Sequence, residues 1–107
     1  MRLYHNPRCS KSRQAVMMLT ERGVRFEEYR YLELGIDTED LELLLSLDGV
    51  VRVNDITSEV NYLGDKDETR KLLISEPKVL QRPILIHQGV AVIGRPPEDI
   101  LTLLPEV

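Results

Sequence analysis

Strand and helix patterns alternate over the first 32 residues, and this alternation limits the possible folds more than any other feature of the chain. A short strand is predicted over residues 2–5, because Asn6 and Pro7 form a turn pair directly after it. Apolar residues at helical spacing predict a helix over residues 10–22, which Gly23 ends. Residues 24–32 carry strand-forming aromatic side chains and predict a second strand. Such a strand–helix–strand unit has parallel strands and a right-handed crossover.

A β-hairpin is predicted near the other end of the chain. Two apolar runs, residues 82–87 and 90–93, flank Gln88 and Gly89, a pair that suits a tight turn. A final helix begins at Pro96 and Pro97, because proline is favoured at the first helical positions and acidic residues follow it here. Its apolar side chains are expected to face the core: Ile100, Leu101 and Leu104.

The middle of the chain has a helical character. Asp37 is placed as the N-cap of a helix, with Ile36 and Leu41 as a hydrophobic staple around it. A second helix is predicted over residues 68–75. Between the two helices, residues 49–65 are compatible with a strand, a loop or a short helix, and their pattern does not choose among these.

Together these elements predict an α/β protein with thioredoxin-like architecture: β-α-β, then an inserted helical segment at about residues 36–80, then β-β-α. We expect one domain over residues 1–107, because domains of about 100–150 residues are the commonest. In this architecture the loop after the first strand lies beside Arg82, which precedes the hairpin. The bond between Arg82 and Pro83 is therefore a candidate for a cis peptide, a state nearly confined to bonds before proline.

Composition excludes several classes of function. The chain is 42% apolar and 30% charged, with no apolar run long enough to span a membrane and no secretory leader, so we expect a cytoplasmic protein. The net charge of −4 argues against nucleic acid or an acidic membrane as partner. One cysteine and two histidines assemble no disulfide, CxxC pair or metal site. We expect a monomer with no bound cofactor.

Cys9 is the only cysteine, and it lies where a polar loop becomes the first predicted helix. Free backbone N–H groups at a helix N-terminus lower the pKa of a thiol, and nearby cations act in the same direction. The loop supplies such cations in Arg8, Lys11 and Arg13, and the same groups would attract an oxyanion. The alternative is an inert, buried thiol, but the polar neighbours of Cys9 favour a reactive one.

Three motifs give the chain a resemblance to a known family. They are Tyr4-His5-Asn6-Pro7-Arg8-Cys9-Ser10-Lys11-Ser12-Arg13, Arg82-Pro83-Ile84 and Gly94-Arg95-Pro96. With these motifs the chain resembles the glutaredoxin-dependent arsenate reductases over nearly its whole length. The first motif is the single-thiol version of that family's active site.

The resemblance implies specific roles. Cys9 would be the nucleophile that forms a thiol–arsenic adduct, and His5 a catalytic histidine near it. Arg82 and Arg95 would hold the oxyanion, because a planar guanidinium suits a tetrahedral anion. Three further groups of the Cys9 loop are candidates for substrate binding: Lys11, Ser12 and Arg13. Glutathione would be the co-substrate and glutaredoxin the partner, since one cysteine cannot regenerate itself.

One departure from the family concerns the substrate. The family's third arginine falls near Asn54, with Arg52 two residues away, and Asp55 would repel an oxyanion if it faced the site. Two alternatives therefore stay open. One is a thiol reductase of another small oxidised substrate, and the other is a non-catalytic regulator that binds RNA polymerase, although such relatives use a CxxC pair that this chain lacks.

Overall fold

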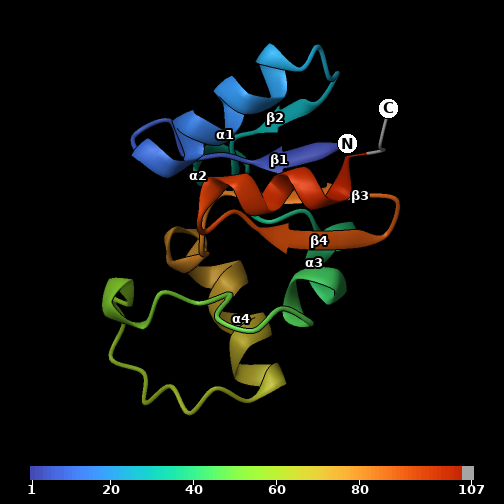
Figure 1. Cartoon of the computed structure of the whole chain (residues 1–107). Helices are drawn as coiled ribbons and strands as arrows, with labels where there is room; N and C mark the ends of the chain where they lie inside the picture. The colour runs from blue at the N-terminus through green and yellow to red at the C-terminus, as the bar shows by residue number, and fades with distance from the viewer. Residues whose placement is uncertain (105–107) are drawn as a thin grey trace.

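Four strands form one mixed sheet in the order β2-β1-β3-β4 in this computed structural model, which describes residues 1–104 (Figure 1). The central strand β1 (Arg2–Tyr4) pairs in parallel with β2 (Glu27–Tyr29) and antiparallel with β3 (Ile84–His87). β4 (Val90–Ile93) pairs antiparallel with β3. The predicted βαβ unit and the predicted hairpin are both confirmed.

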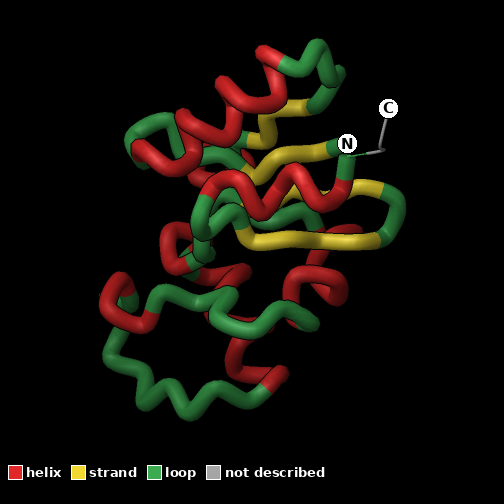
Figure 2. Tube along the Cα trace, viewed as in Figure 1, coloured by secondary structure: helices red, strands yellow, loops and turns green. Residues whose placement is uncertain are grey.

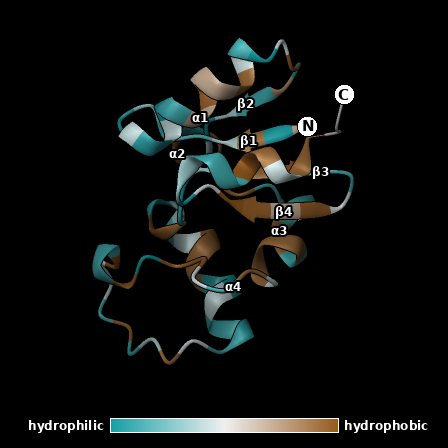
Figure 3. Cartoon of the chain, viewed as in Figure 1, coloured by the Kyte–Doolittle hydropathy of each residue, from teal (hydrophilic) through white to brown (hydrophobic). Residues whose placement is uncertain are grey.

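The sheet has a different apolar core on each face. Leu3 and Leu85 belong to a cluster with Ala15 and Leu19 of α1 (Ser10–Glu21) and Ile100 of η3 (Pro97–Leu103). Tyr4 and Ile84, their neighbours along the two strands, belong to a second cluster. This cluster also contains residues of the chain's middle segment: Leu41, Leu44, Leu72, Leu73 and Val79. This alternation follows from the period of two along a strand. The hydropathy colouring shows β4 and α3 as strongly apolar elements (Figure 3).

The middle segment is helical, as predicted. It contains α3 (Thr38–Leu45), η1 (Val53–Asp55), α4 (Lys66–Ser75) and η2 (Pro77–Val79). Asp37 is the N-cap of α3, because its side chain accepts a hydrogen bond from the backbone N–H of Glu39 at 2.9 Å. A long stretch without regular structure joins η1 to α4 (Figure 2).

The structure differs from the sequence prediction in the second strand and in the type of the last helix, and it decides the region that the sequence left open. The second strand covers only Glu27–Tyr29, and the short helix α2 (Tyr31–Leu34) takes the last part of the predicted strand. Tyr31 is fully buried in the second core, so packing overrides its strand propensity. The last helix is a 3-10 helix, and the undecided region has one isolated bridge, between Val51 and Leu80, in place of a strand.

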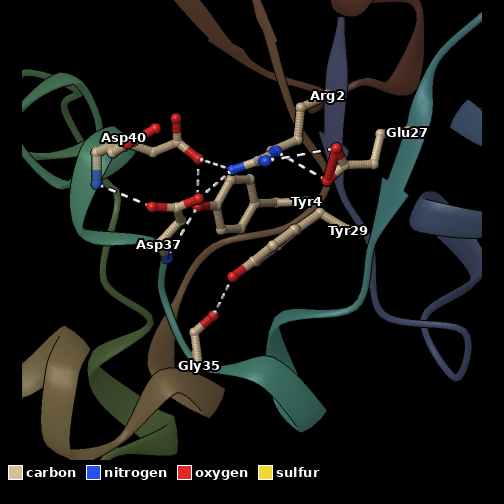
Figure 4. Close-up of polar contacts among 8 residues, drawn as sticks. Arg2, Tyr4, Glu27, Tyr29, Gly35, Asp37 and Asp40 are labelled. Carbon is tan, nitrogen blue, oxygen red and sulfur yellow. Dashed lines mark hydrogen bonds and ion pairs between the residues drawn. The ribbon is translucent and has the colours of Figure 1, made fainter.

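A polar network ties α3 to the central strand (Figure 4). Arg2 Nη1 lies 2.7 Å from Oδ2 of both Asp37 and Asp40. The hydroxyl of Tyr4 donates to Asp40 Oδ2 at 2.6 Å and accepts from the backbone N–H of Asp37 at 3.2 Å. Burial raises the pKa of Tyr4, and the hydrogen bond to Asp40 raises it further. The N-terminus of α3 is thus fixed to the same strand that carries the Cys9 loop.

Candidate functional site

Cys9 lies directly before α1, at the end of the loop that follows β1. Its backbone is extended, with φ −91° and ψ 124°, and its carbonyl accepts the N–H of Arg13 at 3.0 Å, the first bond of the helix. The side chain of Asn6 shapes the loop, because its Oδ1 accepts the backbone N–H of Arg8 at 3.0 Å. The predicted position of the thiol at a helix N-terminus is therefore confirmed.

Two of the candidate binding residues hold the loop itself. Ser12 is fully buried, and its hydroxyl accepts the backbone N–H of Asn6 at 3.3 Å. Arg13 Nη1 donates to the carbonyl of Pro7 at 3.0 Å. Lys11 is half-buried in the first turn of α1. The side chains of Ser12 and Arg13 thus shape the backbone around Cys9, and a role for Lys11, Ser12 or Arg13 in substrate binding stays a prediction.

The pKa of the Cys9 thiol lies below its ordinary value. Partial burial acts to raise it and is the largest single influence, but several groups together outweigh burial. These are the backbone N–H groups of Ser12 and Lys11, the Arg82 side chain and the Ser12 hydroxyl. The thiolate is therefore stabilised by the helix terminus, as the sequence predicted, and by the Arg82 guanidinium, where the sequence had suggested the cations of the loop.

Arg95 contacts the sulfur directly. Its Nη2 lies 3.7 Å from Cys9 Sγ, and its Nε donates to the carbonyl of Arg82 at 2.9 Å. Arg95 follows β4 and Arg82 precedes β3, so the hairpin brings both arginines to the end of the sheet where the Cys9 loop leaves β1 (Figure 1). Both arginines precede a cis-proline, Pro83 and Pro96, of which the sequence indicated only the first.

Arg82 lies between two anionic groups. On one side it lowers the pKa of Cys9, and on the other its Nη1 lies 3.3 Å from Asp55 Oδ2 and 3.4 Å from the carbonyl oxygen of Lys78. Its Nε is buried and has no hydrogen-bond partner among residues 1–104. Arg82 thus has a free donor for a further acceptor in the site.

His5 is placed near the loop but in a neutral form. It is 4% exposed, and burial lowers its pKa, although Glu28, with Oε1 3.7 Å from Nε2, acts in the opposite direction. Its Nδ1 has no hydrogen-bond partner in the described part of the chain. The sequence suggested that a positive His5 would support the thiolate, but the lowered pKa disfavours that form. A catalytic role for His5 stays a prediction.

The region around the family's third arginine carries mixed charges. Asn54 lines an open cavity of about 350 Å³ together with Asp55, Lys78 and Arg82. Arg52 does not line this cavity, and its Nε lies 2.8 Å from Asp55 Oδ2. The exchange of a cation for an amide at Asn54 stays a prediction, whereas Asp55 does face Arg82.

Sequence reasoning missed Tyr31 as a neighbour of the site. Its hydroxyl is buried without a hydrogen-bond partner in good geometry among the described residues, although Asn6 lies close enough to influence it. Burial raises the pKa of Tyr31 to about 12, Arg82 lowers it and the Cys9 thiolate raises it. The sequence placed Tyr31 inside the predicted second strand as a strand-forming aromatic residue, and that signal does not distinguish a site residue from a core residue.

Neither a metal-binding cluster nor a membrane-spanning helix is found within residues 1–104. No group of three or more His, Cys, Asp or Glu side chains is placed to hold a metal ion there. None of the helices in that part of the chain has the length and apolar character needed to cross a membrane.

The chain is similar to several known proteins over nearly its whole length. The model of the ArsC family matches residues 4–103. The chain is 38% identical to the protein YfgD of Escherichia coli, over 97% of this chain and 96% of the relative. It is 37% identical to an arsenate reductase of Neisseria meningitidis, with 97% of each chain covered. A solved arsenate reductase from Vibrio cholerae superposes with a TM-score of 0.78 at 32% identity, covering 97% of this chain and 98% of the other. The Cys9 loop, both arginines and nearly the whole fold thus lie within the match, and the chain belongs to the ArsC family.

Proposed function

We propose that the protein is a monothiol arsenate reductase in which Cys9 attacks arsenate and glutathione and glutaredoxin complete the reduction. The observation that carries this proposal is the guanidinium of Arg95 with its Nη2 3.7 Å from Cys9 Sγ. A thiolate and a cation at that separation can serve one reaction, in which the sulfur attacks and the cation holds the oxyanion. The family and the names of its arsenate reductases support this choice of substrate.

The first step forms the bond between sulfur and arsenic. The Cys9 thiolate adds to the arsenic of arsenate, and one arsenate oxygen leaves as water after protonation. Arg82 and Arg95 neutralise the charge on the remaining oxygens, since a guanidinium keeps its charge at any physiological pH. The buried Nε of Arg82, which has no partner among residues 1–104, is available to one of these oxygens.

The second step reduces arsenic. The thiolate of glutathione attacks the sulfur of Cys9, and the sulfur–arsenic bond breaks with its electron pair staying on arsenic, which passes from As(V) to As(III). Arsenite leaves, and Cys9 remains in a mixed disulfide with glutathione. A thiolate of glutaredoxin then attacks the glutathione sulfur and releases Cys9 as a thiolate. This sequence requires a reducing compartment, so the cytoplasm is the proposed location.

The test is a coupled assay with arsenate, glutathione, glutathione reductase, glutaredoxin and NADPH. NADPH oxidation is expected to depend on arsenate and on the wild-type protein, and to disappear with Cys9→Ser. Ser10→Ala, at the first residue of α1 and next to Cys9, is a matched control and is expected to keep the activity. Turnover by Cys9→Ser, or none by the wild-type protein, would refute the proposal.

A further inference from the structure

Asp55 is an acidic group inside a cluster of cations. Its Oδ2 lies 2.8 Å from Nε of Arg52 and 3.3 Å from Nη1 of Arg82. The side chains are 33%, 30% and 16% exposed respectively, so water screens these charges less than on an open surface. Arg52 lowers the pKa of Asp55 most and Arg82 lowers it further, so the carboxylate is charged at neutral pH.

Arg82 cannot serve Asp55 and a substrate equally well. It already supports the Cys9 thiolate, and its Nη1 is shared between Asp55 and the carbonyl of Lys78. Asp55 and the Lys78 carbonyl occupy only Nη1, so an oxyanion that binds Arg82 can use Nη2 or Nε, or displace one of these acceptors from Nη1. Each acceptor that already binds the Arg82 guanidinium therefore lowers the affinity of the site for the oxyanion.

The cavity beside Arg82 adds a second reason. Asp55 and Arg82 line the same space, together with the neutral amide of Asn54. An oxyanion bound there faces two cations, Arg82 and Lys78, and one carboxylate, Asp55, which repels it. The repulsion grows with the charge of the oxyanion, so it penalises a dianion more than a monoanion.

We propose that Asp55 is a specificity-determining residue of the oxyanion site: it competes with the substrate for Arg82 and disfavours highly charged oxyanions. This inference rests on the proposed function, because it concerns the same site. Arg52 is the group that positions Asp55, since the two are joined by the shorter ion pair. Removal of the Asp55 charge would release Arg82 to both the substrate and the thiolate.

The test measures alkylation of Cys9 by iodoacetamide, which needs no turnover. Bound arsenate is expected to slow this alkylation. The arsenate concentration that halves the alkylation rate is expected to be about three- to fivefold lower for Asp55→Asn than for wild type, a change of the size expected for a partly exposed ion pair. Without arsenate, the alkylation midpoint of Asp55→Asn is expected to fall by about half a pH unit, because Arg82 then has no carboxylate that competes with the thiolate. A merely structural role for Asp55 would not lower that midpoint.

The controls separate charge from packing. Asp67→Asn breaks another Asp–Arg pair three residues apart, with Arg70 at 2.7 Å, and is expected to behave as wild type. Asp55→Glu keeps the charge and is expected to stay near wild type, whereas Asp55→Ser must shift both readouts in the same direction as Asp55→Asn. An unchanged or higher midpoint in both Asp55→Asn and Asp55→Ser overturns the inference. A wild-type protein that arsenate does not protect contradicts the proposed substrate instead, while the midpoint still tests Asp55.

Discussion

Arg95 links the backbone of one site residue to the sulfur of another. Its Nε holds the carbonyl of Arg82, and its Nη2 approaches Cys9. The guanidinium is therefore oriented by one hydrogen bond while its other donors face the reactive group. A lysine at this position could supply the charge but not both directed bonds.

Arg95→Ala is expected to raise the KM for arsenate about tenfold or more, since hydrogen bonds to charged groups contribute about 1.5–3 kcal/mol. Steady-state kinetics in the coupled assay measures this change. Arg22→Ala, at the exposed end of α1, is the control that loses the same charge away from Cys9. A KM for Arg95→Ala equal to that of Arg22→Ala would show that Arg95 does not bind the substrate.

The first part of the segment between η1 and α4 is held by the carboxylate of Glu76. Oε1 of Glu76, just after α4, accepts the backbone N–H of Thr57 at 3.0 Å and the Thr57 hydroxyl at 2.8 Å. Its second oxygen accepts the hydroxyl of Ser58. These bonds lower the pKa of Glu76 from 4.5 to about 2. The segment that directly follows Asn54 and Asp55 is thus anchored to the end of a helix.

Glu76→Gln is expected to destabilise the protein at neutral pH and to lose this effect in acid. Because the folded-state pKa of Glu76 is depressed, its contribution is complete above pH 4.5 and declines as the pH falls toward about 2. Urea unfolding of wild type and variant at several pH values between these limits measures the difference. Glu59→Gln, at an exposed site nearby, is the control. A difference between wild type and Glu76→Gln that does not shrink in acid would rule out this role.

Local signals explain which elements could be predicted. The helix α1, the Asp37 cap and the hairpin depend on periodicity, a capping side chain and a two-residue turn, all visible over a few neighbouring positions. In the turn, Gln88 and Gly89 have φ values of 50° and 75°, which the residue pair allows. The undecided segment depends on contacts with Glu76, some 19 residues away, and its sequence shows no sign of them.

The site was predictable in the same limited sense. Cys9, Arg82 and Arg95 were recognisable from motifs, and the structure brings them together. The ion pair between Asp55 and Arg82 joins residues 27 positions apart, so only the folded chain shows that Asp55 faces the site. The neutral form of His5 also needed the structure, because it follows from burial.

The molecule gathers its chemistry at one end of the sheet. The Cys9 loop leaves β1 there, Arg82 enters β3 there and Arg95 leaves β4 there (Figure 1). Gly94, directly before Arg95, packs closely against Pro83 and Ile100. A Cβ at Gly94 would lie 2.8 Å from Cγ of Pro83 and 2.9 Å from Cγ2 of Ile100, both closer than real contacts allow.

Gly94→Ala is therefore expected to destabilise the whole protein by about 1–3 kcal/mol, the usual cost of overpacking a core. It is also expected to raise the alkylation midpoint of Cys9, because Arg82 and Arg95 flank the displaced contact. Urea unfolding and alkylation measure the two effects. Val90→Ala, at a 49% exposed position of the same hairpin, serves as the control. A Gly94→Ala variant as stable as wild type would contradict the packing described.

The central claim is that the fold holds Cys9 as a thiolate beside two arginines. The most direct measurement is the rate of Cys9 alkylation by iodoacetamide against pH, in the folded protein and in the same protein unfolded in urea. The account predicts a folded-state midpoint clearly below the about 8.5 of an unperturbed thiol, and a return to that value on unfolding. A folded-state midpoint at or above the unfolded one would contradict it.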